Sequence, residues 1–213
     1  MRNTVKYLIF LIIYLACGGN LQAQNYTFRN VVMSDGLSGL LVNTIYKDSE
    51  GFVWLGTDNC LDRFDGVKVR HFEFRGIESG RKKRVNSVTE TASKQLWVGN
   101  GIGLWRLNRT NSQLERIVPE KIDFAVNTLL ANEDVLYIGT EKGLFIHKDG
   151  QLLQVLTDRN MLAACNRIMD ICLNEDKTVL WLATVQGLFS YSLKDGKIDS
   201  WHFQENVPEA DYF

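Results

Sequence analysis

The sequence of 213 residues predicts an all-β protein made of β-propeller blades, each a four-stranded antiparallel sheet. An aromatic residue recurs four times at intervals of 43, 40 and 44 residues, and a period of this length is typical of propeller blades. Each interval divides into four short runs of alternating apolar residues separated by turn residues. Helical repeats of similar length would instead need runs of about 10–15 residues with a 3.6-residue period and few glycines.

The first repeat shows the strands most clearly. Apolar residues alternate within each run, and Asp, Asn, Ser and Gly gather between the runs, where turns require them. We expect strands at residues 42–47, 52–57, 61–65 and 67–72.

Each repeat carries a large ring on its second strand, and in three of the four a glycine follows two residues later. These structural anchors are Trp54 and Gly56, Trp97 and Gly99, Tyr137 and Gly139, and Trp181. We expect each ring to fill the wedge between neighbouring blades, where burying an aromatic ring stabilises the fold by roughly 4–6 kcal/mol before opposing terms. The glycine lets the next blade approach closely. A second glycine begins the third strand in three repeats, whereas Cys60 stands there in the first, so that turn must differ or be strained.

Composition excludes several classes of protein. The chain has 24 Lys and Arg against 25 Asp and Glu, a net charge of −1. It therefore lacks the positive electrostatic field that would attract nucleic acid or an anionic membrane. A hydrophobic fraction of 45% and an aromatic fraction of 11% exclude a disordered chain. We therefore expect a folded domain that does not bind nucleic acid.

The N-terminus has the pattern of an export signal. Arg2 and Lys6 precede the apolar run Tyr7–Cys17, and small residues follow. A helix of this run would reach about 17 Å, too short for a bilayer core of roughly 30 Å. We predict a signal peptide at 1–23, cleaved after Ala23, and a propeller domain at 24–213; an uncleaved anchor or a buried strand is the alternative.

Removal of the signal peptide leaves three cysteines: Cys60, Cys165 and Cys172. An odd number excludes a complete disulfide framework. We expect isolated buried thiols, with a Cys165–Cys172 disulfide as the alternative. The sequence has no Cys-x-x-Cys or Cys/His cluster that would indicate zinc, so we predict no metal and no cofactor.

The motifs of the first repeat resemble a known family. They are Asp35-Gly36-Leu37-Ser38, Val42-Asn43-Thr44-Ile45, Asp48-x-x-Gly51-x-x-Trp54-Leu55-Gly56-Thr57 and Leu61-x-Arg63-Phe64-Asp65-Gly66. They resemble the two-component regulator propeller repeats that begin the periplasmic sensors of hybrid two-component systems in Bacteroidetes. The resemblance extends over roughly residues 25–213.

The resemblance implies a fold and a function. It implies a ring of seven blades, of which this chain would hold about four, so we expect a fragment of a longer protein. It also implies a periplasmic sensor of oligosaccharides in a parent anchored in the inner membrane. The implied partners are the remaining blades, downstream signalling domains including a histidine kinase, and a second copy in a dimeric full-length receptor. The chain itself would not be an enzyme.

Propeller topology places the turns between second and third strands on the same face as the connections between blades. We expect a ligand on that face. The candidate ligand-binding residues are Asp58, Asn59, Arg81, Arg84, Asn100, Glu141, Lys142 and Gln186.

Two smaller patterns near this face have structural interpretations that we favour. Asparagines recur at the start of the innermost strand, at Asn43, Asn86, Asn127 and Asn166, and we expect them to bond backbone at the strand entrance. Arg75 and the cluster Arg81–Arg84 form either a solvated loop, which we favour, or a site for the carboxylate or sulfate of an acidic sugar.

Two other classes of function stay open. One is an exported enzyme acting on polysaccharide, a lyase or a glycoside hydrolase, and the other is a scaffold that binds proteins. The histidines His71, His147 and His202 lie at different phases of the repeat, and no motif in the sequence places a Ser or Cys nucleophile beside any of them. We therefore predict no catalytic residues.

Overall fold

The structure is a computed structural model that describes residues 6–7, 30–77, 83–117, 122–155 and 167–201. The chain divides into two compact units, Met1–Val31 and Val32–Phe213, and the fold described below is that of the second unit. The predicted signal peptide lies outside the described residues except for Lys6 and Tyr7. Among the described residues, no helix is long and apolar enough to cross a membrane.

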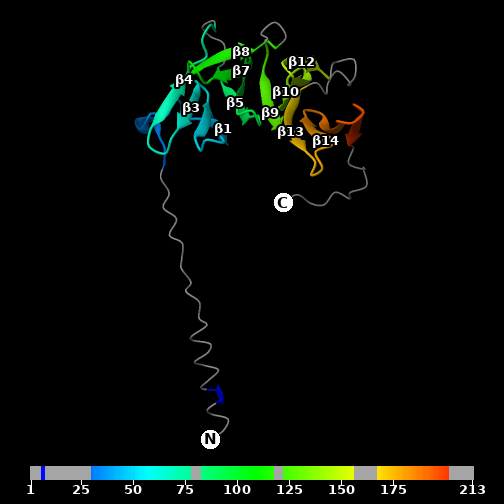
Figure 1. Ribbon diagram of the computed structural model, residues 1–213, viewed down its shortest axis with the longest axis horizontal. Helices are drawn as coiled ribbons and strands as arrows, with labels where there is room; N and C mark the ends of the chain where they lie inside the picture. Colours follow the sequence, from blue (N-terminus) through cyan, green and yellow to red (C-terminus); the bar gives the residue numbers. More distant parts are fainter. Residues whose placement is uncertain (1–5, 8–29, 78–82, 118–121, 156–166, 202–213) are drawn as a thin grey trace, which may run out of the picture. The chain divides into compact units, whose positions relative to one another are not determined.

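The second unit consists of four antiparallel four-stranded sheets, which confirms the predicted all-β blades (Figure 1). A short 3-10 helix, η1 (Met33–Asp35), precedes the first sheet. The strands of the first two blades are β1 (Val42–Lys47), β2 (Val53–Thr57), β3 (Leu61–Phe64), β4 (Val69–Phe72), β5 (Val85–Glu90), β6 (Leu96–Asn100), β7 (Gly103–Asn108) and β8 (Gln113–Ile117). Those of the next two are β9 (Val126–Asn132), β10 (Val135–Thr140), β11 (Gly143–Lys148), β12 (Gln151–Gln154), β13 (Ile168–Leu173), β14 (Val179–Thr184), β15 (Gly187–Ser192) and β16 (Ile198–Trp201).

The first strand of each blade lies against the first strand of the next. Strand β1 contacts β5, β5 contacts β9, and β9 contacts β13, so these four strands are the innermost strands of successive blades. Each also shows a register irregularity where it pairs with its second strand. In the first blade the observed strands agree with the predicted ones to within one or two residues.

The aromatic anchors pack between blades, as predicted. Trp54, Trp97 and Tyr137 are 1%, 4% and 5% exposed, and each joins a cluster with apolar residues of the following blade. Trp181 of the fourth blade is only half-buried, because the described residues include no further blade against which it could pack.

The glycines that follow the anchors mark close approaches between blades, also as predicted. A Cβ atom on Gly56 would lie 2.6 Å from Cγ1 of Val85, and one on Gly99 would lie 2.5 Å from Cγ1 of Val126. Both distances are far below ordinary carbon–carbon contact. The innermost strand of the next blade therefore excludes a side chain at these positions.

The first blade differs from the others in the turn between its second and third strands. Gly103, Gly143 and Gly187 have positive φ angles, whereas Cys60 does not. Thr57 Oγ1 nonetheless accepts a hydrogen bond from the backbone N–H of Cys60 at 3.1 Å and donates one to its carbonyl oxygen at 3.0 Å. The Cys60 turn thus has a different conformation, without the strain of a left-handed cysteine.

Candidate ligand-binding face and a buried side-chain cluster

A polar pocket lies at the entrance of the innermost strands. It has a volume of about 240 Å³ and is lined by Asn43, Arg84, Asn86, Asn127, Arg167 and Met169. Each blade contributes through its first strand or through the residues just before it, so the pocket opens where the four blades converge.

The asparagines of this pocket join neighbouring blades. Asn86 Nδ2 donates to the carbonyl oxygen of Val126 at 2.8 Å, and Asn127 Nδ2 donates to that of Ile168 at 2.7 Å. The prediction that these residues bond backbone is confirmed for both, but the partner belongs to the next blade. Asn43 instead donates to the side chain of Asp58 at 2.9 Å. Asn166 lies outside the described residues.

Asp58 brings the first blade into contact with an arginine of the second. Its Oδ1 lies 3.8 Å from Nε of Arg84, and the side chains of Asp58 and Arg84 are 41% and 59% exposed. An exposed pair at this distance contributes little to stability, so Arg84 can exchange Asp58 for another anion. Of the eight candidate ligand-binding residues, Arg84 therefore lines this pocket and Asp58 contacts two of its lining residues, Asn43 and Arg84.

The other candidates lie apart from it. Asn59 is exposed, and its Nδ2 donates to the carbonyl oxygen of Ser38 at 2.7 Å. Glu141 and Lys142 are exposed on the third blade, where Nζ of Lys142 lies 4.5 Å from the ring of Phe124. Gln186 is exposed on the fourth blade. Arg81 lies outside the described residues, as do all but Lys83 and Arg84 of its basic cluster.

Asn100 has a structural position that the sequence did not indicate. It is fully buried, and its Oδ1 accepts hydrogen bonds from Trp105 Nε1 at 3.1 Å and from the backbone N–H of Ile102 at 3.0 Å. These bonds hold the turn between β6 and β7. A residue so placed offers no surface to a ligand.

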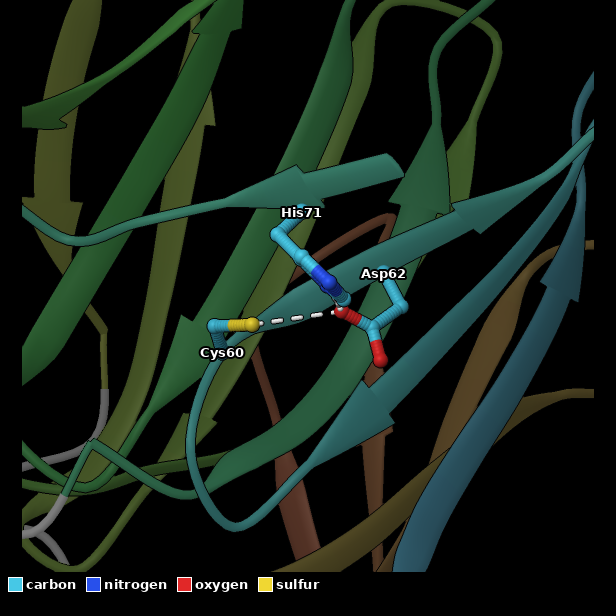
Figure 2. Close-up of side chains that lie close together, drawn as sticks. All are labelled: Cys60, Asp62 and His71. Carbon is cyan, nitrogen blue, oxygen red and sulfur yellow. Dashed lines mark hydrogen bonds and ion pairs between the residues drawn. The ribbon is translucent and has the colours of Figure 1, made fainter. Parts of the chain in front are cut away.

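A second arrangement of functional side chains lies within the first blade. Asp62 on β3 and His71 on β4 are paired directly across the two strands, and Cys60 comes just before β3 (Figure 2). Asp62 Oδ1 lies 2.7 Å from His71 Nδ1 and accepts a hydrogen bond from Cys60 Sγ at 3.2 Å. No sequence motif places a Cys beside a histidine and no Cys/His cluster was found in the sequence, yet the fold brings Cys60 and His71 to the same carboxylate. The antiparallel pairing of residues 62 and 71, which follows from the turn at Asp65-Gly66, is the signal that could have revealed it.

The chemistry of Cys60 is not that of a nucleophile. Burial, with the nearby carboxylates of Asp62 and Glu73, raises the pKa of the Cys60 thiol to about 12. The thiol therefore stays protonated near neutral pH, whereas an attacking cysteine must be a thiolate. Cys60 is a free buried thiol, as predicted; Cys172 is also free but exposed, which corrects the expectation for that residue, and Cys165 lies outside the described residues.

His147 is half-buried and packs against a core ring, that of Trp97. Its ring lies 4.8 Å from that of Trp97, and burial lowers its pKa. His202 lies outside the described residues.

Comparison with known proteins agrees with this architecture. Residues 36–59, in the segment that enters the first blade and its first two strands, match the family model described as the two-component regulator propeller. Over 66 residues the chain is 36% identical to histidine kinase P4 of Formosa agariphila, a match covering 31% of this chain and 5% of that kinase.

Solved structures share the fold. An extracellular domain assigned to a hybrid two-component system of B. thetaiotaomicron superposes with a TM-score of 0.66 at 20% identity, covering 82% of this chain and 26% of that one. Virginiamycin B lyase from Staphylococcus aureus superposes with a TM-score of 0.60 at 13% identity, covering 76% of this chain and 55% of that one. At these identities the likeness shows the fold alone. The chain therefore carries a repeat of the two-component regulator propeller family, and its four blades have the β-propeller fold.

Proposed function

We propose that this chain is part of the exported sensor domain of a two-component regulator. The observation that carries the proposal is the regulator propeller repeat in a chain whose blades converge on a polar pocket. The similarity to a histidine kinase and to an extracellular domain of a hybrid two-component system supports the same role. In this proposal the histidine kinase lies elsewhere in a longer, membrane-anchored parent protein, and the chain performs no chemistry.

In this proposal the ligand is an oligosaccharide, and the side chains that line the pocket support it. Asparagine side chains and arginines are the donors and acceptors that bind sugar hydroxyls, and a guanidinium binds a carboxylate or sulfate with two parallel hydrogen bonds. Arg84 and Arg167 line the pocket from different blades, so an acidic sugar between them would be held from both sides. Binding energy that differs between two arrangements of the receptor would then shift the kinase equilibrium.

Thermal stabilisation tests the sensor role directly. A ligand that binds only the native state raises stability by RT ln(1 + [L]/Kd), which is about 2.7 kcal/mol at a concentration one hundred times Kd. We expect a panel of neutral and acidic oligosaccharides to include a member that raises the melting temperature and is recovered unchanged. Cleavage of that oligosaccharide by the purified protein would instead show that the protein is a lyase or a hydrolase. Absence of stabilisation by every member, together with capture of a protein partner, would favour a scaffold.

A further inference from the structure

The first blade departs from the other three at two positions that come together in space. Its third strand begins after a cysteine, Cys60, where the other blades have glycine. Two residues later it places Asp62 opposite Leu55 on the second strand. The residues at this second position in the other blades are all aromatic: Trp105, Phe145 and Phe189. A carboxylate thus occupies a site that the repeat otherwise fills with a ring.

Asp62 is fully buried and fully engaged. Ser38 donates to Oδ2 twice, from its backbone N–H at 2.8 Å and from its hydroxyl at 2.7 Å. The other oxygen, Oδ1, faces Cys60 Sγ and His71 Nδ1. Burying a charged carboxylate is costly unless it is paired or coordinates a metal. The cluster therefore has the orienting hydrogen bonds that metal-binding carboxylates carry on the oxygen away from the metal.

We propose that Cys60, Asp62 and His71 bind a divalent transition metal of the zinc class. Their donor atoms, Sγ, a carboxylate oxygen and a ring nitrogen, all lie within 4.8 Å of one another. Thiolate, imidazole and carboxylate are the ligands that zinc takes in proteins, whereas calcium and magnesium take oxygen ligands. The donor set therefore selects zinc, or cobalt as its spectroscopic substitute.

The geometry needs only a small adjustment. Zinc bonds of about 2.0–2.3 Å in a tetrahedral arrangement put nitrogen and oxygen roughly 3.4 Å apart, and sulfur and oxygen roughly 3.6 Å apart. The observed separations are 2.7 Å for His71 and Asp62 and 3.2 Å for Cys60 and Asp62. His71 has room to retreat, because its side chain is 46% exposed on the outermost strand of the blade.

A pocket beside the cluster leaves one coordination position open. It has a volume of about 300 Å³ and is lined by Ser38, Asn59, Cys60, His71, Glu73, Phe74 and Lys83. Glu73 also lines this space, outside the three-residue cluster, so a water at the open position could bridge its carboxylate to the metal. The carboxylates of Asp62 and Glu73 lie on the side of the cluster that a cation would enter, and a bound metal would take the place of the thiol proton.

This site goes beyond the sensor role and does not depend on it. It shares no residue with the pocket at the innermost strands. Since Ser38 precedes the first strand and bonds Asp62, the metal would fasten the entering segment to the first blade.

Cobalt binding tests the proposal with a spectroscopic signature. The chain is stripped with a chelator, exchanged into metal-free buffer and titrated with Co²⁺. We expect one equivalent to produce the near-ultraviolet charge-transfer band of a cobalt–thiolate bond, and Zn²⁺ to abolish that band by displacement.

Two cluster variants and one control identify the ligands. Cys60→Gly introduces the residue that the other three blades use, so the fold should persist, and the charge-transfer band should disappear. His71→Gln keeps a polar partner for Asp62 and should lower the affinity for Zn²⁺ at least about tenfold, as measured by competition with a chelating dye. Cys172→Ser, which removes the exposed free thiol, should change neither. Absence of stoichiometric binding, or a band that survives Cys60→Gly while circular dichroism shows an intact fold, would overturn the proposal.

Discussion

The close approach of successive blades predicts a specific energetic coupling between Gly99 and Val126. A Cβ atom on Gly99 would lie 2.5 Å from Cγ1 of Val126. Carbon atoms pack best at about 3.5–4.0 Å, so Gly99→Ala must push the two blades apart by roughly 1 Å. Overpacking of this kind costs about 1–3 kcal/mol. We therefore expect Gly99→Ala to lower the free energy of unfolding by about 2 kcal/mol.

The partner substitution relieves the same contact. Val126 is fully buried, and Val126→Ala removes two methyl groups and leaves a cavity, at a cost of about 2–3 kcal/mol. In the double variant the methyl group added at position 99 enters the space that the valine side chain has vacated. The double variant should therefore lose about 2–3 kcal/mol, well short of the sum of the single losses, with a coupling energy of roughly 2 kcal/mol.

Urea denaturation followed by circular dichroism measures each free energy of unfolding. Ala183→Gly is the matched control, because the fourth blade already has alanine at this position and its side chain is exposed. That change should cost only the backbone entropy of glycine in a strand, about 0.5–1 kcal/mol. Additive losses in the double variant would refute the inference that Val126 excludes a side chain at position 99.

Three further predictions concern other contacts of the blades. Arg109 forms ion pairs of 2.8 Å with Glu50 and with Glu90, so it joins the first two blades. Arg109→Ala should lower the free energy of unfolding by about 1 kcal/mol, and this loss should become smaller in high salt. Lys197→Ala is the control, because the pair of Lys197 with Asp195 is exposed and 3.8 Å long, and its free energy of unfolding should not change. Maleimide labelling at pH 8 with peptide mapping should modify Cys172 readily and Cys60 slowly, because Cys60 is buried and has a pKa raised to about 12; equal labelling of both in the folded protein would contradict the buried position. Hydrogen bonds from Ser93 lower the pKa of Asp134 in the folded protein. The stability that these bonds contribute is therefore present above the unfolded-state pKa of Asp134 and is lost as the pH falls through its folded-state pKa. Asp134→Asn should reduce the drop in melting temperature in acid, and an unchanged drop would count against the contact.

The repeat made most of the fold predictable. The rings of Trp54, Trp97 and Tyr137 recur because each fills the same wedge between blades. Their spacing therefore predicted the length of a blade and the order of its strands. Gly56 and Gly99 were predictable for the same reason, since each blade repeats one inter-blade contact. Trp181 differs because no further blade among the described residues packs against it, and it is only half-buried.

The functional surfaces were less predictable because they depend on departures from the repeat. Asn100 sits at a turn where the topology places ligand-facing residues, yet its side chain turns inward to bond Trp105, an aromatic residue that the first blade lacks at that position. Cys60, Asp62 and His71 come together through the register between β3 and β4, which the turn at Asp65-Gly66 could have indicated, and through burial of Asp62, which the sequence does not reveal. Asp58 and Arg84 meet because two blades converge, and the predicted topology anticipated only that they share a face.

Calorimetric titration with a stabilising oligosaccharide tests the sensor account most directly. The intact protein should bind it without turnover, and the double variant Arg84→Ser/Arg167→Ser should bind at least about tenfold more weakly, because each lost charged hydrogen bond costs about 1.5–3 kcal/mol. Lys148→Ser, at the end of β11 on the opposite face, should bind as the unchanged protein does. Equal affinity of all three proteins would contradict ligand binding at the convergence of the blades.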